Sequence, residues 1–102
     1  MNRFAQHTTL LATPGNADRL ARKFIESLEI QRDNPDCVLM LVSRSPVDDN
    51  VVYLTEVWSS EATWEEARTS PGISAWAKDM PALVAEPPQS VLLDLVGAKG
   101  IG

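Results

Sequence analysis

Apolar and polar side chains alternate along residues 51–58, as they do in a β-strand. One face of this segment carries Val52, Leu54, Glu56 and Trp58. The opposite face is also mostly apolar, so we expect other parts of the protein to cover both faces. A carboxylate and an indole therefore share one covered face, and Glu56 and Trp58 mark the first place to look for a ligand.

Residues 17–32 show the clearest helical pattern in the chain. Asn16 precedes this segment and is placed to cap the helix with its side-chain oxygen. The helix is expected to end near Arg32, because the residue before Pro35 avoids helical angles. Apolar residues recur at the three-and-four spacing of one buried stripe, namely Ala17, Leu20, Ala21, Phe24, Ile25 and Leu28.

Residues 37–45 predict a strand that pairs with 51–58 through a turn at 46–50. In this hairpin Arg44 would lie across from about Val52, and Met40 across from about Glu56. Strict alternation would place Cys37 on the same face as Leu39. The hairpin therefore brings Met40 next to the predicted ligand face.

The rest of the chain predicts two more strands and an interrupted second helix. The strands are expected at 4–12 and 90–96, and residues 98–102 read as a frayed tail. Ser59 or Ser60 caps a helix that runs to about Thr69. The Ser-Pro-Gly sequence at 70–72 then breaks it, and Pro81 kinks the second piece before it closes near Val84.

This order of elements predicts an α+β, ferredoxin-like βαββαβ fold with a four-stranded antiparallel sheet and a broken second helix. The length of 102 residues fits one domain. One face of such a sheet is free of helices, and here that face is too apolar for water, so we expect a homodimer that packs sheet against sheet. Residues predicted for this face are Leu39, Leu41, Tyr53, Val57, and either Leu93 with Leu95 or their alternates.

Composition narrows the function classes. The net charge is -5 and no basic block occurs, which disfavours nucleic acid and anionic membrane surfaces as partners. A single cysteine, Cys37, excludes an internal disulfide and a cysteine-built metal site, so no metal is expected and the cytoplasm is the natural location. No apolar run has the length of a signal peptide or a membrane span.

Several short motifs follow one another along the chain, namely Thr13-Pro14-Gly15, the segment 34–37, the segments 54–58 and 60–62, Ser70-Pro71, and the segment 86–88. Taken in this order, they resemble the antibiotic biosynthesis monooxygenase (ABM) domain, whose members are ferredoxin-like proteins that dimerise into an α+β barrel. The resemblance covers roughly residues 9–97. It implies a small-molecule pocket, and in some members the oxygenation of aromatic polyketides without metal or flavin. The family also includes haem-degrading and isomerase-like relatives.

Individual positions match the family unevenly. Trp58 stands where the polyketide-anthrone oxygenases have a pocket tryptophan, whereas Leu54 replaces a pocket asparagine and Trp64 a tyrosine. Arg44 falls near a position that those enzymes give to a histidine. Haem-degrading relatives bind iron through a helix histidine, but Ala67 occupies the position at which many members carry one, and the only histidine here is His7.

Oxygenation without a cofactor needs a dry aromatic pocket, a proton acceptor and a donor for the developing oxyanion. We predict Trp58 and Glu56 as catalytic residues, with Glu56 as the acceptor and Arg44 or Tyr53 as the donor. The expected substrate is an aromatic, quinol or polyketide-like small molecule, and no cofactor is expected. Residues predicted to bind it are Trp64, Arg44, Trp76, Met40, Met80, Leu54 and His7.

Other interpretations of the same residues remain open. The three tryptophans are also typical core anchors, and Glu56 could instead pair with Arg22, Lys23 or Lys78. At the level of function, the alternatives are a cyclase or isomerase acting in the same pocket, and a non-catalytic dimeric module that binds a small molecule.

Overall fold

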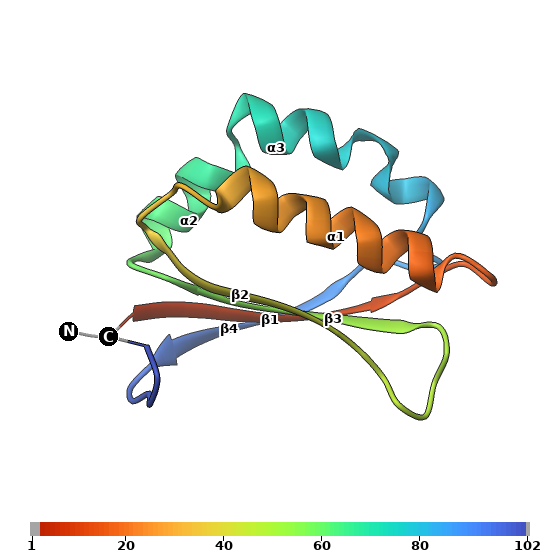
Figure 1. Cartoon of the computed structure of the whole chain (residues 1–102), viewed down its shortest axis with the longest axis horizontal. Helices are drawn as coiled ribbons and strands as arrows, with labels where there is room; N and C mark the ends of the chain where they lie inside the picture. Colours follow the sequence, from red (N-terminus) through yellow and green to blue (C-terminus); the bar gives the residue numbers. More distant parts are fainter. Residues whose placement is uncertain (1–2, 102) are drawn as a thin grey trace.

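The structure, a computed structural model, describes residues 3–101 and contains one antiparallel sheet with helices on one of its faces (Figure 1). The four strands lie in the order β2-β3-β1-β4 and pair antiparallel, which confirms the predicted four-stranded antiparallel sheet of a ferredoxin-like α+β fold. Along the chain the elements are β1 (Arg3–Leu11), α1 (Ala17–Gln31), β2 (Cys37–Arg44), β3 (Val51–Trp58), α2 (Glu61–Arg68), α3 (Pro71–Trp76), the 3-10 helix η1 (Ala77–Ala82) and β4 (Gln89–Leu95).

The β2–β3 hairpin has the predicted register. Arg44 lies opposite Val52, and Met40 lies opposite Glu56. The exception is at the start of β2, where a bulge between Cys37 and Leu39 interrupts the pairing. The bulge turns Cys37 to the helix side, against the cluster that contains Trp58, so the prediction that Cys37 shares a face with Leu39 is wrong.

The main core lies between α1 and the helix-facing side of the sheet. Leu10, Leu20 and Val52 are almost completely buried there, and burial of each such side chain is worth roughly 1.5–3 kcal/mol. The predicted stripe of α1 is wrong at Ile25, which is 51% exposed. The buried face continues instead through Ser27 and Gln31, which line a cavity and whose polar groups are paired, with the Phe24 carbonyl oxygen and with Asn34 Nδ2 respectively.

Capping residues explain where the helices start. Ser60 caps α2 and forms a reciprocal capping box with Thr63, as predicted for one of the two serines. Ser70 caps α3, and Pro71 occupies its first turn. Asn16 stands at the N-cap of α1, but its side chain donates to Thr13 Oγ1 at 2.7 Å instead of capping the helix.

The face of the sheet opposite the helices carries several exposed apolar side chains. Leu41, Val91 and Leu93 are each about half exposed, at 48%, 55% and 46%. After β4, residues 98–101 form neither helix nor strand, and Gly102 of the predicted tail lies outside the described residues. None of the helices within residues 3–101 is long and apolar enough to cross a membrane.

Candidate active site

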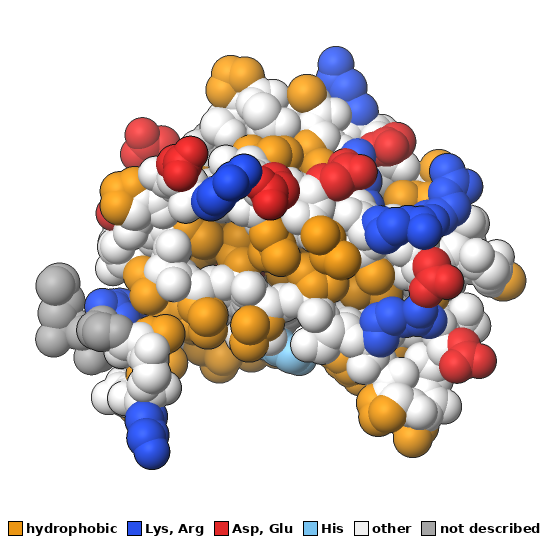
Figure 2. Space-filling view, viewed as in Figure 1, with side chains coloured by type: hydrophobic (Ala, Val, Ile, Leu, Met, Phe, Trp, Pro, Cys, Tyr) orange, Lys and Arg blue, Asp and Glu red, His pale blue; other side chains and the backbone are white. Residues whose placement is uncertain are grey.

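A cavity of about 260 Å³ lies between the helix layer and the helix-facing side of the sheet. Figure 2 shows apolar side chains gathered in the middle of the visible face, below the charged side chains of the helices. Such an apolar hollow with a few polar groups is typical of a small-molecule site. Six residues predicted for the site line this cavity, namely Met40, Leu54, Glu56, Trp58, Trp64 and Trp76.

Three predicted residues lie elsewhere. Arg44 is at the far end of the hairpin, where it forms an ion pair with Asp18 and donates to the Asp49 carbonyl oxygen at 2.8 Å. His7 is at an alternate position of β1 that faces away from the helices, and its ring stacks on Tyr53 with centroids 5.6 Å apart.

Met80 is the third residue outside the cavity. It lies in η1 and packs against the main core cluster. The α-helix ends at Trp76 and the chain continues as a 3-10 helix, which has about three residues per turn, so the α-helical spacing that groups Met80 with Trp76 does not bring both side chains to the cavity.

Glu56 supplies the carboxyl group of the cavity. It is only 7% exposed, and Trp58 Nε1 donates a hydrogen bond to its Oε1 at 3.2 Å. Burial raises the pKa of Glu56 above its ordinary value, and the hydrogen bond from Trp58 opposes part of that rise. A carboxyl group with a raised pKa is better matched to proton transfer near neutral pH.

No lysine or arginine within residues 3–101 forms an ion pair with Glu56. The predicted alternative of a salt bridge to Lys23 is wrong, because Lys23 pairs with Asp79 and its ammonium lies 5.4 Å from the centre of the Trp76 ring. The buried carboxyl group therefore depends on the Trp58 indole for stabilisation.

Trp76 forms one wall of the cavity and is held in place by several contacts. Its Nε1 donates to the Lys23 carbonyl oxygen at 2.7 Å, which ties α3 to α1. Its ring meets Phe24 edge to face, with centroids 5.2 Å apart and an interplanar angle of 69°. These contacts fix the aromatic surface that a ligand would meet.

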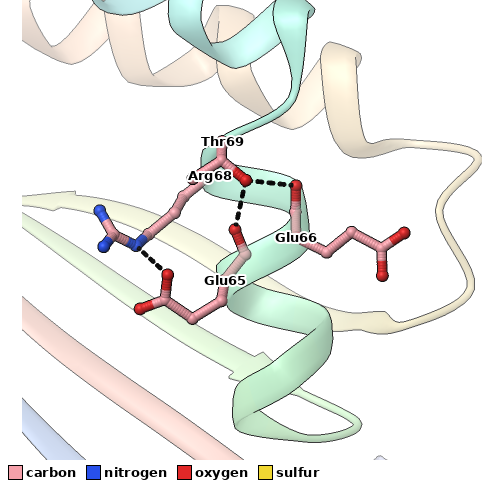
Figure 3. Close-up of polar contacts among 4 residues, drawn as sticks. All are labelled: Glu65, Glu66, Arg68 and Thr69. Atoms are coloured by element: carbon pink, nitrogen blue, oxygen red, sulfur yellow. Dashed lines mark hydrogen bonds and ion pairs between the residues drawn. The ribbon is translucent and has the colours of Figure 1, made fainter.

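Trp64 forms another wall, and Arg68 lies over it. The Trp64 ring is 4.9 Å from that of Phe4, and the Arg68 guanidinium is 5.0 Å from the Trp64 centroid. Arg68 Nε also donates to Glu65 Oε2 at 3.0 Å, and the Thr69 hydroxyl donates to two backbone carbonyls at the end of α2 (Figure 3). Arg68 brings a positive charge to the lining of the cavity.

The sequence interpretation missed the polar residues contributed by the other strands. Gln6 and Thr8 of β1 and Ser90 of β4 line the cavity beside Glu56, and Gln6 lies directly across from Glu56 in the sheet. The sequence could have indicated Gln6 and Thr8, because they are polar residues on a face of β1 that is otherwise apolar. Arg68 was also missed, although it follows Trp64 by four residues and shares its helix face.

Cys37 is not equipped for nucleophilic chemistry. Burial and the nearby Glu56 carboxylate raise the pKa of its thiol to about 11, so the thiol stays protonated at neutral pH. Within residues 3–101, no group of three His, Cys, Asp or Glu side chains is arranged to hold a metal ion.

Comparison with known proteins identifies the family to which this chain belongs. The model of the antibiotic biosynthesis monooxygenase family matches residues 3–79, and the chain belongs to this family. No curated protein matches the sequence.

Solved structures share the fold over nearly the whole chain. A protein from Chloroflexus aurantiacus, assigned to the antibiotic biosynthesis monooxygenases, is 25% identical with a TM-score of 0.86, covering 98% of this chain and 99% of that one. SnoaB from Streptomyces nogalater, a cofactor-independent oxygenase solved as a mutant, is 16% identical with a TM-score of 0.83 and the same coverage. At that identity the second likeness concerns the fold alone.

Proposed function

We propose that this protein is a monooxygenase that oxidises an aromatic, quinol or polyketide-like small molecule without metal or flavin. The observation that carries the proposal is the position of Glu56. Its carboxyl group is buried in an aromatic cavity, has a raised pKa, and is hydrogen-bonded by Trp58 rather than neutralised by a cation. Membership of the family supports the same reaction class.

In this reaction the deprotonated substrate, rather than a cofactor, supplies the electrons that reduce O₂. The Glu56 carboxylate takes a proton from an activated C–H or O–H group of the ring system, and the resulting carbanion or phenolate passes one electron to O₂. The radical and superoxide combine to form a C–O bond, and protonated Glu56 returns its proton to the peroxide. Loss of water from a carbon-bound hydroperoxide then breaks the O–O bond and leaves a carbonyl group, so that R₂CH₂ and O₂ yield R₂C=O and H₂O.

The structure changes which protein groups can assist. Arg44 and Tyr53, the predicted oxyanion donors, lie outside the cavity. Arg68 is the cation that lines it, and the Trp58 N–H stabilises the carboxylate form of Glu56. The walls formed by Trp64 and Trp76 would hold a planar ring and exclude water around the reacting carbon.

Oxygen uptake with a hydroxylated anthrone tests the proposal. Glu56→Gln should reduce turnover by about 10²-fold or more, since it removes the proton acceptor while keeping the side chain's shape. Glu66→Gln, on the exposed side of α2, is the matched control and should leave turnover unchanged. Full activity of Glu56→Gln would assign the proton transfer to another group.

The same assay separates the runner-up functions. Conversion of a substrate without consumption of oxygen would indicate a cyclase or isomerase that uses Glu56 for proton transfer alone. Quenching of tryptophan fluorescence without any conversion would indicate a binding module.

We also propose that the helix-free face of the sheet packs against a second copy of the chain. Its half-exposed Leu41, Val91 and Leu93 form an apolar surface of the kind that soluble proteins cover. Sedimentation at micromolar concentration should give a dimer, and Leu93→Asp should yield monomers. Val47→Asp, in the exposed hairpin turn, should not change the mass.

A further inference from the structure

Arg68 places a positive charge in the lining of a cavity that is otherwise apolar, neutral or acidic. Of the lining residues in the described part of the chain, it is the one with a basic side chain. The protein carries a net charge of -5, so this cation does not belong to a generally basic surface. A few placed polar or charged groups in an apolar cavity fix which ligand binds and in which orientation.

Most of the Arg68 guanidinium lacks a hydrogen-bond partner within residues 3–101. Its Nε donates to Glu65 Oε2 at 3.0 Å, but neither Nη1 nor Nη2 donates to another described residue. Figure 3 shows these two nitrogens pointing away from Glu65. The pair is half-exposed on both sides and joined by a single bond, so it is weak. The terminal edge of the guanidinium can therefore donate two parallel hydrogen bonds to a planar anion.

Trp64 holds the guanidinium over the aromatic wall. The two residues are four positions apart on one face of α2, and the guanidinium carbon lies 5.0 Å from the centre of the Trp64 ring. The ring is itself packed on Phe4, with centroids 4.9 Å apart. Because stacking already restricts the Arg68 side chain, less conformational freedom is lost when it binds an anion.

Glu56 restricts where a ligand in this cavity can carry a negative charge. Its carboxyl group is buried on β3, and a second anion beside it would be repelled strongly because water does not screen the two charges there. Arg68 lies on α2, in the other layer of the molecule, and is half-exposed. An anionic ligand would therefore turn its charged group to Arg68 and its reacting carbon or hydroxyl group to Glu56.

We infer that Arg68 is a specificity-determining residue that binds a carboxylate group on the aromatic ligand. The ligand class is therefore an aromatic acid, with its ring between the tryptophan walls. A carboxamide of the same shape lacks the negative charge and gains less from the guanidinium. This inference rests on the proposed function for the identity of the site but concerns recognition, not oxygen chemistry.

The test compares 2-naphthoate with 2-naphthamide as probes, by isothermal titration calorimetry of the intact protein at neutral pH and low ionic strength. The wild type should bind the acid about fivefold more tightly, the effect of one half-exposed ion pair. Arg68→Gln should remove this preference and leave the affinity for the amide unchanged. Arg68→Lys keeps the charge without the planar pair of donors and should keep a smaller preference.

Two further variants separate recognition from a structural role of the ion pair. Glu65→Gln breaks the same pair as Arg68→Gln, but it removes the competing carboxylate and should raise the affinity for the acid about twofold. Arg32→Gln is the matched control, because Arg32 pairs with a glutamate three residues earlier on α1 and lies outside the cavity. It should keep the wild-type preference.

Equal binding of the two probes by the wild type, tighter binding of the amide, binding of neither, or an acid preference that survives in Arg68→Gln would each overturn the inference. So would weaker binding of the acid by Glu65→Gln, or loss of the preference in Arg32→Gln. If Arg68→Gln fails to fold, the wild type and Glu65→Gln still decide the question.

Oxygen uptake distinguishes this failure from failure of the proposed function. An acid preference that depends on Arg68, without oxygen consumption by any hydroxylated aromatic acid or anthrone, would overturn the oxygenase proposal and leave the recognition role standing. Oxygen uptake with the same kcat/KM in wild type and Arg68→Gln, together with equal binding of the two probes, would do the reverse.

Discussion

Replacement of Trp58 by phenylalanine isolates the hydrogen bond on which the buried carboxyl group depends. Trp58 is 2% exposed, and its Nε1 is the donor to Glu56 Oε1 at 3.2 Å. A hydrogen bond to an ionised group contributes about 1.5–3 kcal/mol, and one to a neutral group about 0.5–1.5 kcal/mol. The smaller ring adds a packing loss that does not depend on pH. The cost of Trp58→Phe should therefore be about 1 kcal/mol larger where Glu56 is ionised than where it is protonated.

The sign of the pH dependence follows from the raised pKa of Glu56. Well below the ordinary carboxyl pKa of 4.5, the folded and unfolded chains both carry the proton, and Glu56 adds no pH dependence. As pH rises above that value, the unfolded chain loses the proton first, so this residue lowers the free energy of unfolding until the folded carboxyl also ionises. In Trp58→Phe the pKa of Glu56 should rise further, and the decline should extend to higher pH.

Urea unfolding followed by circular dichroism, at a fixed protein concentration and at several pH values, measures these quantities. Glu56→Gln provides the reference that lacks the titration, and the double variant completes a thermodynamic cycle. The expected result is a coupling energy between the two positions that grows with pH. A cost of Trp58→Phe that is the same at pH 4 and pH 8 would refute the stabilising role assigned to the indole N–H.

Three further substitutions test separate parts of the structure. Ser60→Ala removes the cap of α2 and should lower the free energy of unfolding by about 1 kcal/mol, measured by urea unfolding; an unchanged midpoint would exclude the cap as a stabilising feature. Arg44→Ala breaks an exposed ion pair with Asp18, so the free energy of unfolding should fall by less than about 1 kcal/mol and oxygen uptake should not change. A large loss of activity would instead indicate that Arg44 contributes to the active site. Trp76→Phe removes the donor to the Lys23 carbonyl and should cost about 0.5–1.5 kcal/mol, with weaker ligand quenching in fluorescence titrations; unaltered stability and binding would show that this anchor is dispensable.

Much of the hairpin could be predicted from the sequence because its determinants are local. The turn at 46–50 and the alternation on either side of it set the register that pairs Met40 with Glu56. Glu56 and Trp58 are two residues apart on one strand, so their shared face needs no tertiary information. The same reasoning failed at Cys37, where a bulge that no residue type announces shifts the alternation.

The candidate site was predicted in part for the same reason. Residues on β3 and its hairpin partner were placed correctly on the cavity side, whereas Arg44, although on that side of β2, is too far along the strand to reach it. His7 lies on the opposite face of the sheet, and Met80 lies in the 3-10 helix that follows α3, where the α-helical spacing no longer holds. A pattern of apolar residues does not show how far along a strand a cavity extends, nor where an α-helix gives way to a 3-10 helix.

By itself, the sequence determined the order of the elements, the apolar character of both sheet faces, and the adjacency of Glu56 and Trp58. Each of these follows from spacing within a few residues, where backbone geometry dictates which side chains share a face. Only the tertiary structure decided that Thr8 meets Ser90 from 82 positions away, that Gln6 lies beside Glu56, and that no cation reaches that carboxyl group within residues 3–101. Such meetings depend on how distant strands pair and how helices pack over them, and those long-range contacts leave no periodic trace in the chain.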